Sequence, residues 1–268
     1  MGKLFALLQS VLPQHLISRL VGLLAKSEHR LVKSVFISLF SLAYDINMEE
    51  AVRQEDEFVS FNDFFTRELK PEARPIGAGI CSPADGRVSA VGHIKDLKLT
   101  QIKGQHYEAA RLLGREDVAE FENGSFITIY LAPHNYHRVH CPVHATVSET
   151  RYIPGKLFSV NAATTKHIKD LFVKNERLVC ELDTKTKPAA LVMVGAMIVA
   201  GIRTRWRESA YPPKTVHEES VQVPLLRGDE VGQFLLGSTV VLLFQDSVQW
   251  QVNPGDPVNM GETIGQID

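Results

Sequence analysis

The first 44 residues carry apolar side chains at three- and four-residue spacing, which is the period of an amphipathic helix. The apolar positions of this repeat are Leu4, Phe5, Leu7, Leu8, Val11, Leu12, Leu16, Leu20, Val21, Leu23 and Leu24. Five basic residues lie among them, with Glu28 as the one acidic residue. The pattern predicts a pair of basic amphipathic helices, which either pack on the rest of the fold or lie in the plane of an anionic membrane surface.

These helices do not read as membrane-spanning segments. Arg19 interrupts the first apolar stretch, and residues 34–44 are too few to cross a bilayer. The segment also lacks the small-residue cleavage site of a signal peptide. We therefore predict surface or core helices here, with no transmembrane anchor.

From Phe58 onward the pattern changes to short runs of β-branched and aliphatic residues separated by Gly and Pro, which is typical of strands. The clearest runs are residues 126–131, 191–194, 197–199 and 239–244. One helix is predicted from about Asn161 to Phe172, with Asn161 as its N-cap. A loop is predicted over residues 205–215, where two prolines and a tryptophan interrupt the pattern.

Three segments of the body share a hairpin-like pattern. Residues 83–91 and 142–147 look alike, and residues 252–265 combine a valine strand, a Pro-Gly-Asp turn and a Gly-Glu-Thr-Ile-Gly exit. This last segment resembles the hammerhead hairpins of biotinyl and lipoyl carrier domains, without their modified lysine. We predict an α+β fold: a β-rich core with barrel-sandwich-like hairpins, preceded by amphipathic N-terminal helices.

Composition and charge narrow the class of protein. The chain has 268 residues, 44% of them hydrophobic and 22% charged, which is ordinary for one or two globular domains and argues against disorder. A net charge of −2 gives no support for a nucleic-acid partner. Cys81, Cys141 and Cys180 are far apart and form no CxxC pair, so we expect reduced thiols in an intracellular compartment.

Histidines are concentrated in one short segment. Four of the ten, His134, His137, His140 and His144, lie within eleven residues. A zinc site is one interpretation, but no HExxH motif and no nearby pair of carboxylates or thiolates completes a ligand set, so we predict no metal. The histidines either make structural hydrogen bonds or serve in catalysis.

A Leu-Gly-Ser-Thr turn at residues 236–239 precedes an apolar run and, taken alone, is an ordinary turn. Together with the turn at Asp85 and the Tyr-His-Arg-Val-His run at residues 136–140, it resembles the phosphatidylserine decarboxylases. Further matching motifs are residues 61–70, 74–76, 82–86, 157–161, 171–177, 194–195 and 227–228 with Gly232 and Phe234. The resemblance covers residue 58 to the carboxyl end, with one departure: Asn135 stands where the family usually has Asp.

The resemblance implies a proenzyme that cuts itself at the Gly237–Ser238 bond, leaving a β chain of residues 1–237 and an α chain of residues 238–268. Asp85, His140 and Ser238 would form the self-cleavage triad, with His140 as base and Asp85 holding its tautomer. Ser238 would become a covalent pyruvoyl cofactor that forms an imine with the substrate amine. His137 is the candidate for the decarboxylation acid and substrate contact, with His140 as the alternative.

The resemblance also implies a substrate, partners and a place in the cell. Phosphatidylserine would be converted to phosphatidylethanolamine and CO₂ by a domain of residues 58–268, while residues 1–57 associate with an anionic membrane surface. The protein would be peripheral on the cytoplasmic side of the cell membrane, as a homodimer of αβ units. Phe61, Phe64 and Phe65 either line the entry of an acyl chain or are ordinary core aromatics.

Three other functions stay open from the residues alone. A serine hydrolase would use the same Asp85, His140 and Ser238, but the sequence has no GxSxG nucleophile elbow. A membrane-associated carrier or binding module would need none of these residues and would stay one uncleaved chain. A pyruvoyl enzyme acting on a soluble amino acid would have no use for the amphipathic helices.

Overall fold

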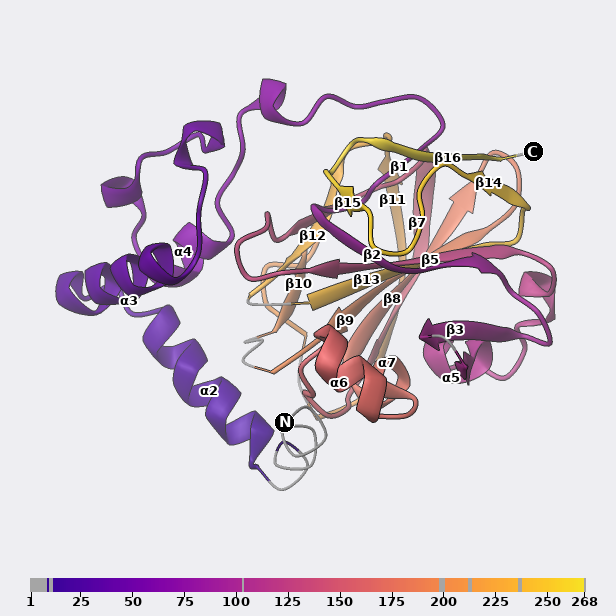
Figure 1. Cartoon of the computed structure of the whole chain (residues 1–268), viewed down its shortest axis with the longest axis horizontal. Helices are drawn as coiled ribbons and strands as arrows, with labels where there is room; N and C mark the ends of the chain where they lie inside the picture. Colours follow the sequence, from indigo (N-terminus) through magenta and orange to yellow (C-terminus); the bar gives the residue numbers. More distant parts are fainter. Residues whose placement is uncertain are drawn as a thin grey trace.

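The structure, a computed structural model, describes residues 9, 12–102, 104–197, 201–211, 214–235 and 238–267. Its centre is an eight-stranded sheet in the order β11-β7-β8-β9-β13-β5-β2-β15, with every neighbouring pair antiparallel (Figure 1). The strands in that order are His217–Leu225, Ala145–Ile153, Arg177–Thr184, Ala189–Gly195, Ser238–Phe244, Ser125–Leu131, Gly86–His93 and Pro257–Val258.

Three smaller sheets complete the β structure. The first is β10 (Ile202–Thr204), β12 (Glu230–Phe234) and β6 (Arg138–His140); the second is β1 (Ile80–Cys81), β16 (Thr263–Ile267) and β14 (Val248–Trp250). The third pairs β3 (Lys98–Ile102) with β4 (Gln105–Glu108). The predicted α+β class with a β-rich core is confirmed, and the tail hairpin pairs with residues 77–88 through the amides of Gly77, Ser82 and Val88.

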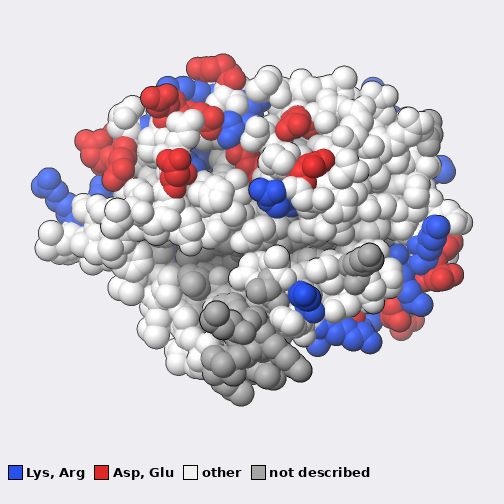
Figure 2. All heavy atoms as spheres, viewed as in Figure 1, with Lys and Arg blue, Asp and Glu red and all other residues white. Residues whose placement is uncertain are grey.

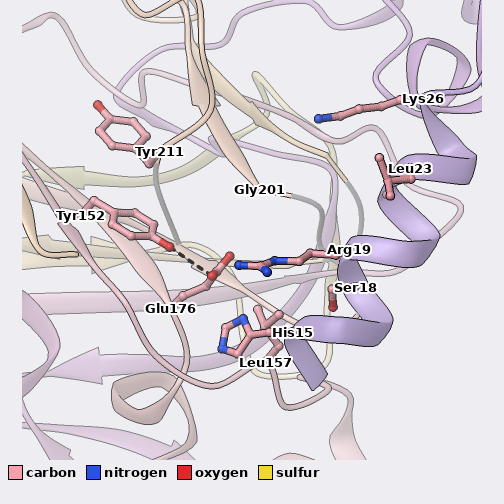
Figure 3. Close-up of a pocket in the computed structure, with 11 residues that line it drawn as sticks. His15, Ser18, Arg19, Leu23, Lys26, Tyr152, Leu157, Glu176, Gly201 and Tyr211 are labelled. Atoms are coloured by element: carbon pink, nitrogen blue, oxygen red, sulfur yellow. Dashed lines mark hydrogen bonds between the residues drawn. The ribbon is translucent and has the colours of Figure 1, made fainter. Parts of the chain in front are cut away.

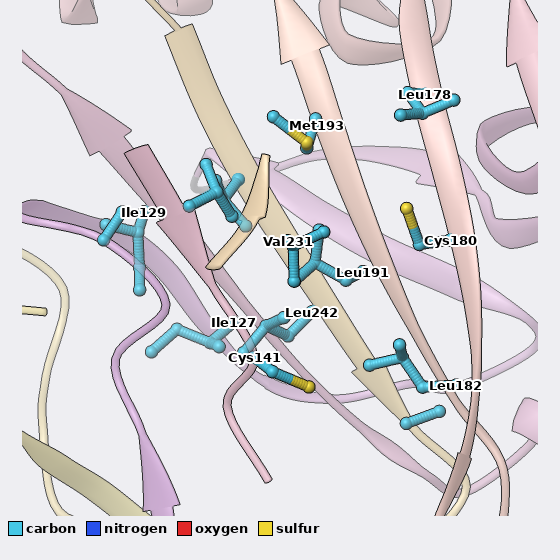
Figure 4. Packing of buried hydrophobic residues seen from close by; sticks show 14 of the residues in the cluster. Ile127, Ile129, Cys141, Leu178, Cys180, Leu182, Leu191, Met193, Val231 and Leu242 are labelled. Carbon is cyan, nitrogen blue, oxygen red and sulfur yellow. The ribbon is translucent and has the colours of Figure 1, made fainter. Parts of the chain in front are cut away.

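The central strands are buried on both faces because their sequences are continuously apolar. In β13, Val240, Leu242 and Phe244 face a core shared with the first two small sheets (Figure 4). Val241 and Leu243 face the opposite core. That second core lies under the short helices α5 (Ala109–Leu113) and α7 (Leu171–Lys174), so the sheet forms the middle layer.

The predicted N-terminal helices are confirmed as α2 (Gln14–Ala25) and α3 (Arg30–Ala43). With α4 (Phe61–Phe65) they form a third apolar cluster beside the sheets, in which Ala25 and Ile37 pack with Phe58 and its neighbours. Residues on both sides of the predicted boundary at 57/58 therefore share one cluster, and that boundary stays a prediction. Within the described part of the chain, no helix is long and apolar enough to cross a membrane.

The single helix predicted from Asn161 to Phe172 is wrong in its length. Asn161 does cap a helix, accepting the amide of Thr164, but that helix, α6, ends after Ala162–His167, and α7 begins four residues later. The Gln101 side chain fills the break: its amide group donates to the carbonyls of Thr165 and Ile168, and its carbonyl accepts the amide of Leu171. These groups would otherwise continue one helix.

The remaining connections are short. In the described part of the chain, 3₁₀ turns occur at Met48–Glu50, Glu55–Glu57, Pro71–Ala73 and Ala119–Phe121. The predicted loop at 205–215 is irregular at each of its described positions. The run predicted as a strand at 197–199 falls largely outside the described residues.

Candidate active site

Ser238 is the first residue of β13 and lies between two neighbouring strands, in register with Leu131 of β5 and Gly195 of β9. It is 1% exposed, and its hydroxyl has no hydrogen-bond partner among the described residues. Leaving a buried hydroxyl unpaired costs about 1–3 kcal/mol, so such a group calls for a functional explanation. Gly237, the other half of the predicted cleavage bond, lies outside the described residues.

His140 is held in one tautomer by the backbone. Its Nδ1 lies 2.7 Å from the carbonyl oxygen of Gly228, which can only accept, so Nδ1 carries the proton. Nε2 lies 2.9 Å from the Tyr136 hydroxyl and accepts from it in the neutral ring. Burial lowers the pKa of His140, which favours that neutral form. Nε2 is therefore the nitrogen free to act as a base once Tyr136 releases it.

Asp85 does not make the predicted contact with His140. Arg74 binds both of its carboxylate oxygens, at 2.9 and 2.6 Å, and the Met260 amide donates to it at 2.8 Å. Two charge-assisted bonds to a guanidinium are stronger than one bond to a neutral imidazole, so Arg74 takes the carboxylate and the Gly228 carbonyl orients the histidine. Asp85 stays close to His140 through the backbone, because the His140 amide donates to the carbonyl of Pro83.

His137 is fully buried and stacks on Phe65, with ring centres 4.0 Å apart. Its Nε2 lies 3.2 Å from the Pro133 carbonyl, and its Nδ1 has no partner among the described residues. Burial lowers the pKa of His137 to about 3, so the ring is neutral and Nδ1 is an unpaired acceptor. The predicted acid role stays a prediction, and burial works against it, because the ring holds no spare proton in this environment.

The turn between β5 and His137 contains Asn135. After β5 ends at Leu131, the Asn135 side-chain oxygen accepts the amide of Ala132 at 2.8 Å, and its own amide donates back to the Ala132 carbonyl. An amide oxygen accepts this bond as a carboxylate would, so Asn in place of the usual Asp preserves the turn. The chain then returns as β6, and just before that strand the His137 carbonyl accepts the amide of Phe234.

An apolar cavity of about 420 Å³ lies between the N-terminal helices and the segments that follow β5 and β9. Its lining includes Pro133 and Met197, which follow the ends of the two strands that flank Ser238. Its other lining residues are Val21, Phe36, Leu39, Phe40, Ala43, Tyr44, Phe61 and Phe65. Phe61 and Phe65 thus line an apolar cavity, as expected if they border the entry of an acyl chain. Phe64 is fully buried in the third apolar cluster, as expected of a core aromatic residue.

The geometry of the site also bears on the serine hydrolase and the metal site that the sequence analysis considered. Ser238 opens a buried central strand, whereas a serine hydrolase needs its nucleophile exposed on a strand-to-helix elbow. No group of three His, Cys, Asp or Glu among the described residues is arranged to hold a metal ion. The sequence analysis did not single out two polar residues of the site. Arg74 binds Asp85, and Glu176 lies over Gly195, the neighbour of Ser238. Both belong to motifs that match the family, at residues 74–76 and 171–177.

Comparisons with known proteins agree over nearly the whole chain. A family model described as phosphatidylserine decarboxylase matches residues 61–266, and a second, described as PSD, matches residues 4–45. A phosphatidylserine decarboxylase proenzyme of Alcanivorax borkumensis is 46% identical, over 98% of this chain and 96% of its own. A proenzyme of the same name from Psychrobacter cryohalolentis is 47% identical over 97% and 98%, and one from Stutzerimonas stutzeri 45% identical over 98% and 94%.

Proposed function

The chain belongs to the phosphatidylserine decarboxylase family and is an enzyme of that type, and from this premise we propose that it cuts itself before Ser238 and uses the new terminus to decarboxylate phosphatidylserine. The observation that carries the proposal is the buried, unpartnered Ser238 hydroxyl at the start of a central strand. A buried hydroxyl without a hydrogen bond lowers stability, and a role in catalysis is one reason for a protein to keep such a group.

The surroundings of Ser238 fit a pyruvoyl group. Conversion of Ser238 to a pyruvoyl group removes its hydroxyl, which makes no hydrogen bond with the described residues. The rest of β13 stays paired with β5 and β9. A pyruvoyl ketone supplies an electrophilic carbonyl that condenses with the substrate amine and accepts the electron pair released with CO₂. The unpaired Nδ1 of His137, on the β5 side, is available to accept a hydrogen bond from the bound headgroup.

His140 is the proposed base for the first step of self-cleavage. Its Nε2 takes the proton of the Ser238 hydroxyl, the oxygen bonds to the Gly237 carbonyl carbon, and the carbon–nitrogen bond between the two residues breaks to leave an ester and a free amine. Loss of the Ser238 Cα proton then expels the ester oxygen with the Gly237 carboxylate, and water releases ammonia. Asp85, held by Arg74, contributes negative charge near the imidazolium formed in the first step.

The lipid substrate explains the exposed apolar faces of α2 and α3. Eight of their large apolar side chains are exposed: Leu16, Leu20, Leu23, Leu24, Leu31, Val35, Leu39 and Leu42. The surface over these helices is largely uncharged in the view of Figure 2, and the apolar cavity opens beside them. We propose peripheral attachment to the anionic cytoplasmic face of the cell membrane, with an acyl chain entering this cavity.

The mass of the purified protein under denaturing conditions tests the self-cleavage. We expect two chains that part between Gly237 and Ser238, the smaller one lighter by one ammonia than a fragment that begins with serine. Ser238→Ala should leave one full-length chain, and cleavage of that variant would refute the mechanism. A homodimer of the two-chain unit, implied by the resemblance, stays a prediction that the mass of the native particle tests.

A second experiment separates the lipid substrate from a soluble amino acid. Leu31→Glu with Leu42→Glu places charge on two side chains that are 70% and 86% exposed. We expect normal self-cleavage, weaker binding to phosphatidylserine vesicles and slower CO₂ release from them. Val216→Glu, at a 60% exposed apolar position on the body, is the matched control. Equal release of CO₂ by the double variant and the control would contradict the membrane role.

A further inference from the structure

We propose that Glu176 is the base that removes the Cα proton of Ser238 in the elimination step of self-cleavage. This inference rests on the proposed function and assigns a residue to its second step. As the Cα–H bond breaks toward the Glu176 carboxylate, a Cα–Cβ double bond forms and the Cβ–Oγ bond breaks. The ester oxygen leaves with the Gly237 carboxylate, and the proton stays on Glu176, so the step needs no further reactant.

Strand register places Glu176 and Ser238 in one row across the sheet. Gly195 of β9 lies between them: its amide donates to the Glu176 carbonyl, and on its other side it pairs with Ser238. Side chains alternate along strands, and Leu178, Met193 and Val240 all face the first core. Two-residue steps from these positions put Glu176, Gly195 and Ser238 on that same face.

Gly195 leaves the space between Glu176 and Ser238 open. A Cβ atom at position 195 would lie 2.9 Å from Cγ and 3.2 Å from Oε1 of Glu176, so the carboxyl lies directly over the glycine. Because the Gly195 amide points toward Glu176, its pair with Ser238 is of the non-hydrogen-bonded type. In such a pair the two Cα atoms are about 4.5 Å apart and their Cα–H bonds point toward one another. The Ser238 Cα–H therefore points toward Gly195, the residue over which the Glu176 carboxyl lies.

The surroundings of Glu176 suit a group that gains and loses a proton near neutral pH. Its Oε2 accepts from the Tyr152 hydroxyl at 3.1 Å, whereas Oε1 has no hydrogen bond among the described residues (Figure 3). A cavity of about 310 Å³ opens over this carboxyl and gives water access to it. The titratable or charged side chains that face the cavity from helix α2, β7 and the loop after β10 are His15, Arg19, Lys26, Tyr152 and Tyr211.

The ionisation of Glu176 is consistent with this role. Burial raises its pKa to about 7, and the hydrogen bond from Tyr152 acts in the opposite direction by favouring the carboxylate. A general base works best when its pKa lies near the working pH. His140, which the proposed function uses for the hydroxyl proton of the first step, is held by Gly228 and Tyr136 at the end of β6 in the small sheet.

The test uses Glu176→Gln in the full chain, made by cell-free synthesis so that processing is followed from its start. Loss of the base should slow formation of the pyruvoyl chain by about 10²–10⁴-fold while leaving the ester step intact. Hydroxylamine cleaves esters, so it should release from Glu176→Gln a fragment that begins with an unchanged serine. His140→Ala is the matched control, since it blocks the ester step and should release nothing.

The outcomes separate this inference from the proposed function. If the natural chain never cleaves, the proposed function fails. If it cleaves and Glu176→Gln forms pyruvoyl at the same rate, or is blocked yet releases nothing with hydroxylamine, the role of Glu176 is overturned. Tyr152→Phe gives an independent test should Glu176→Gln fail to fold. Without the hydrogen bond from Tyr152 the pKa of Glu176 should rise, so the processing rate should begin to increase at a higher pH than in the natural chain. An unchanged dependence of the rate on pH would also overturn the role.

Discussion

The ion pair between Arg74 and Asp85 should be a major determinant of stability, and Arg74→Met tests this directly. The two side chains are 12% and 6% exposed, and Arg74 also contacts Glu50 at 2.9 Å. Removing the guanidinium leaves the Asp85 carboxylate buried, with the Met260 amide as its remaining donor. Breaking a buried pair by deleting one partner costs about 3–5 kcal/mol, because the remaining charge stays desolvated.

The measurement is urea unfolding in a Ser238→Ala background, where the protein stays one chain and the transition refers to one molecule. We expect the free energy of unfolding to fall by about 3–5 kcal/mol. Adding Asp85→Asn to Arg74→Met removes the stranded charge, so the double variant should be more stable than Arg74→Met alone.

Arg111→Met is the matched control. Arg111 pairs with Asp170 through a single contact at 2.9 Å, and its side chain is 48% exposed. Exposed pairs contribute about 0–1 kcal/mol, so this variant should unfold close to the parent. The argument from burial is refuted if Arg74→Met and Arg111→Met lower the free energy of unfolding by the same amount. It is also refuted if adding Asp85→Asn lowers the free energy of unfolding of the Arg74→Met variant further.

Three further predictions concern other buried groups. Burial lowers the pKa of His137 to about 3, against 6.5 in the unfolded chain, so the free energy of unfolding should fall as the pH drops from about 6.5 toward 3. In urea titrations at several pH values, His137→Gln should make this dependence of stability on pH weaker. Phe65→Ala should cost about 3–5 kcal/mol in the same assay, because the ring is 1% exposed; a loss below 1 kcal/mol would contradict its core role. Cys180 is fully buried and its pKa is raised by burial, so it should react with a thiol reagent at the rate of unfolding, and fast labelling of the folded protein would show otherwise.

The sequence predicted those features that depend on local pattern. The three- and four-residue spacing located α2 and α3, and continuous apolar runs located β5 and β13, because burial on both faces needs no information from elsewhere in the chain. Asn161 was predicted as a cap for the same reason: it bonds an amide three residues away.

Features that depend on distant residues could not be predicted in this way. The break between α6 and α7 is made by Gln101, more than sixty residues earlier in the chain. The partner of Asp85 is Arg74, which the motifs contained but to which no spacing rule assigned a contact. Glu176 and Ser238 come into one row only through the pairing of neighbouring strands with Gly195, and a pattern of polar and apolar positions does not encode which strand lies next to which.

The same register would let the proposed cut before Ser238 leave the fold intact. The bond before Ser238 lies at the end of β13, so a break there removes no pairing of that strand with β5 or β9. Beyond it, β15 pairs with β2, and β16 pairs with β1, so three strands of the smaller fragment are hydrogen-bonded to the larger one. Five consecutive side chains from Val240 to Phe244 are at most 1% exposed, and burying each contributes about 1.5–3 kcal/mol. The proposed cut would therefore free one terminus for chemistry while the central sheet holds that terminus in place.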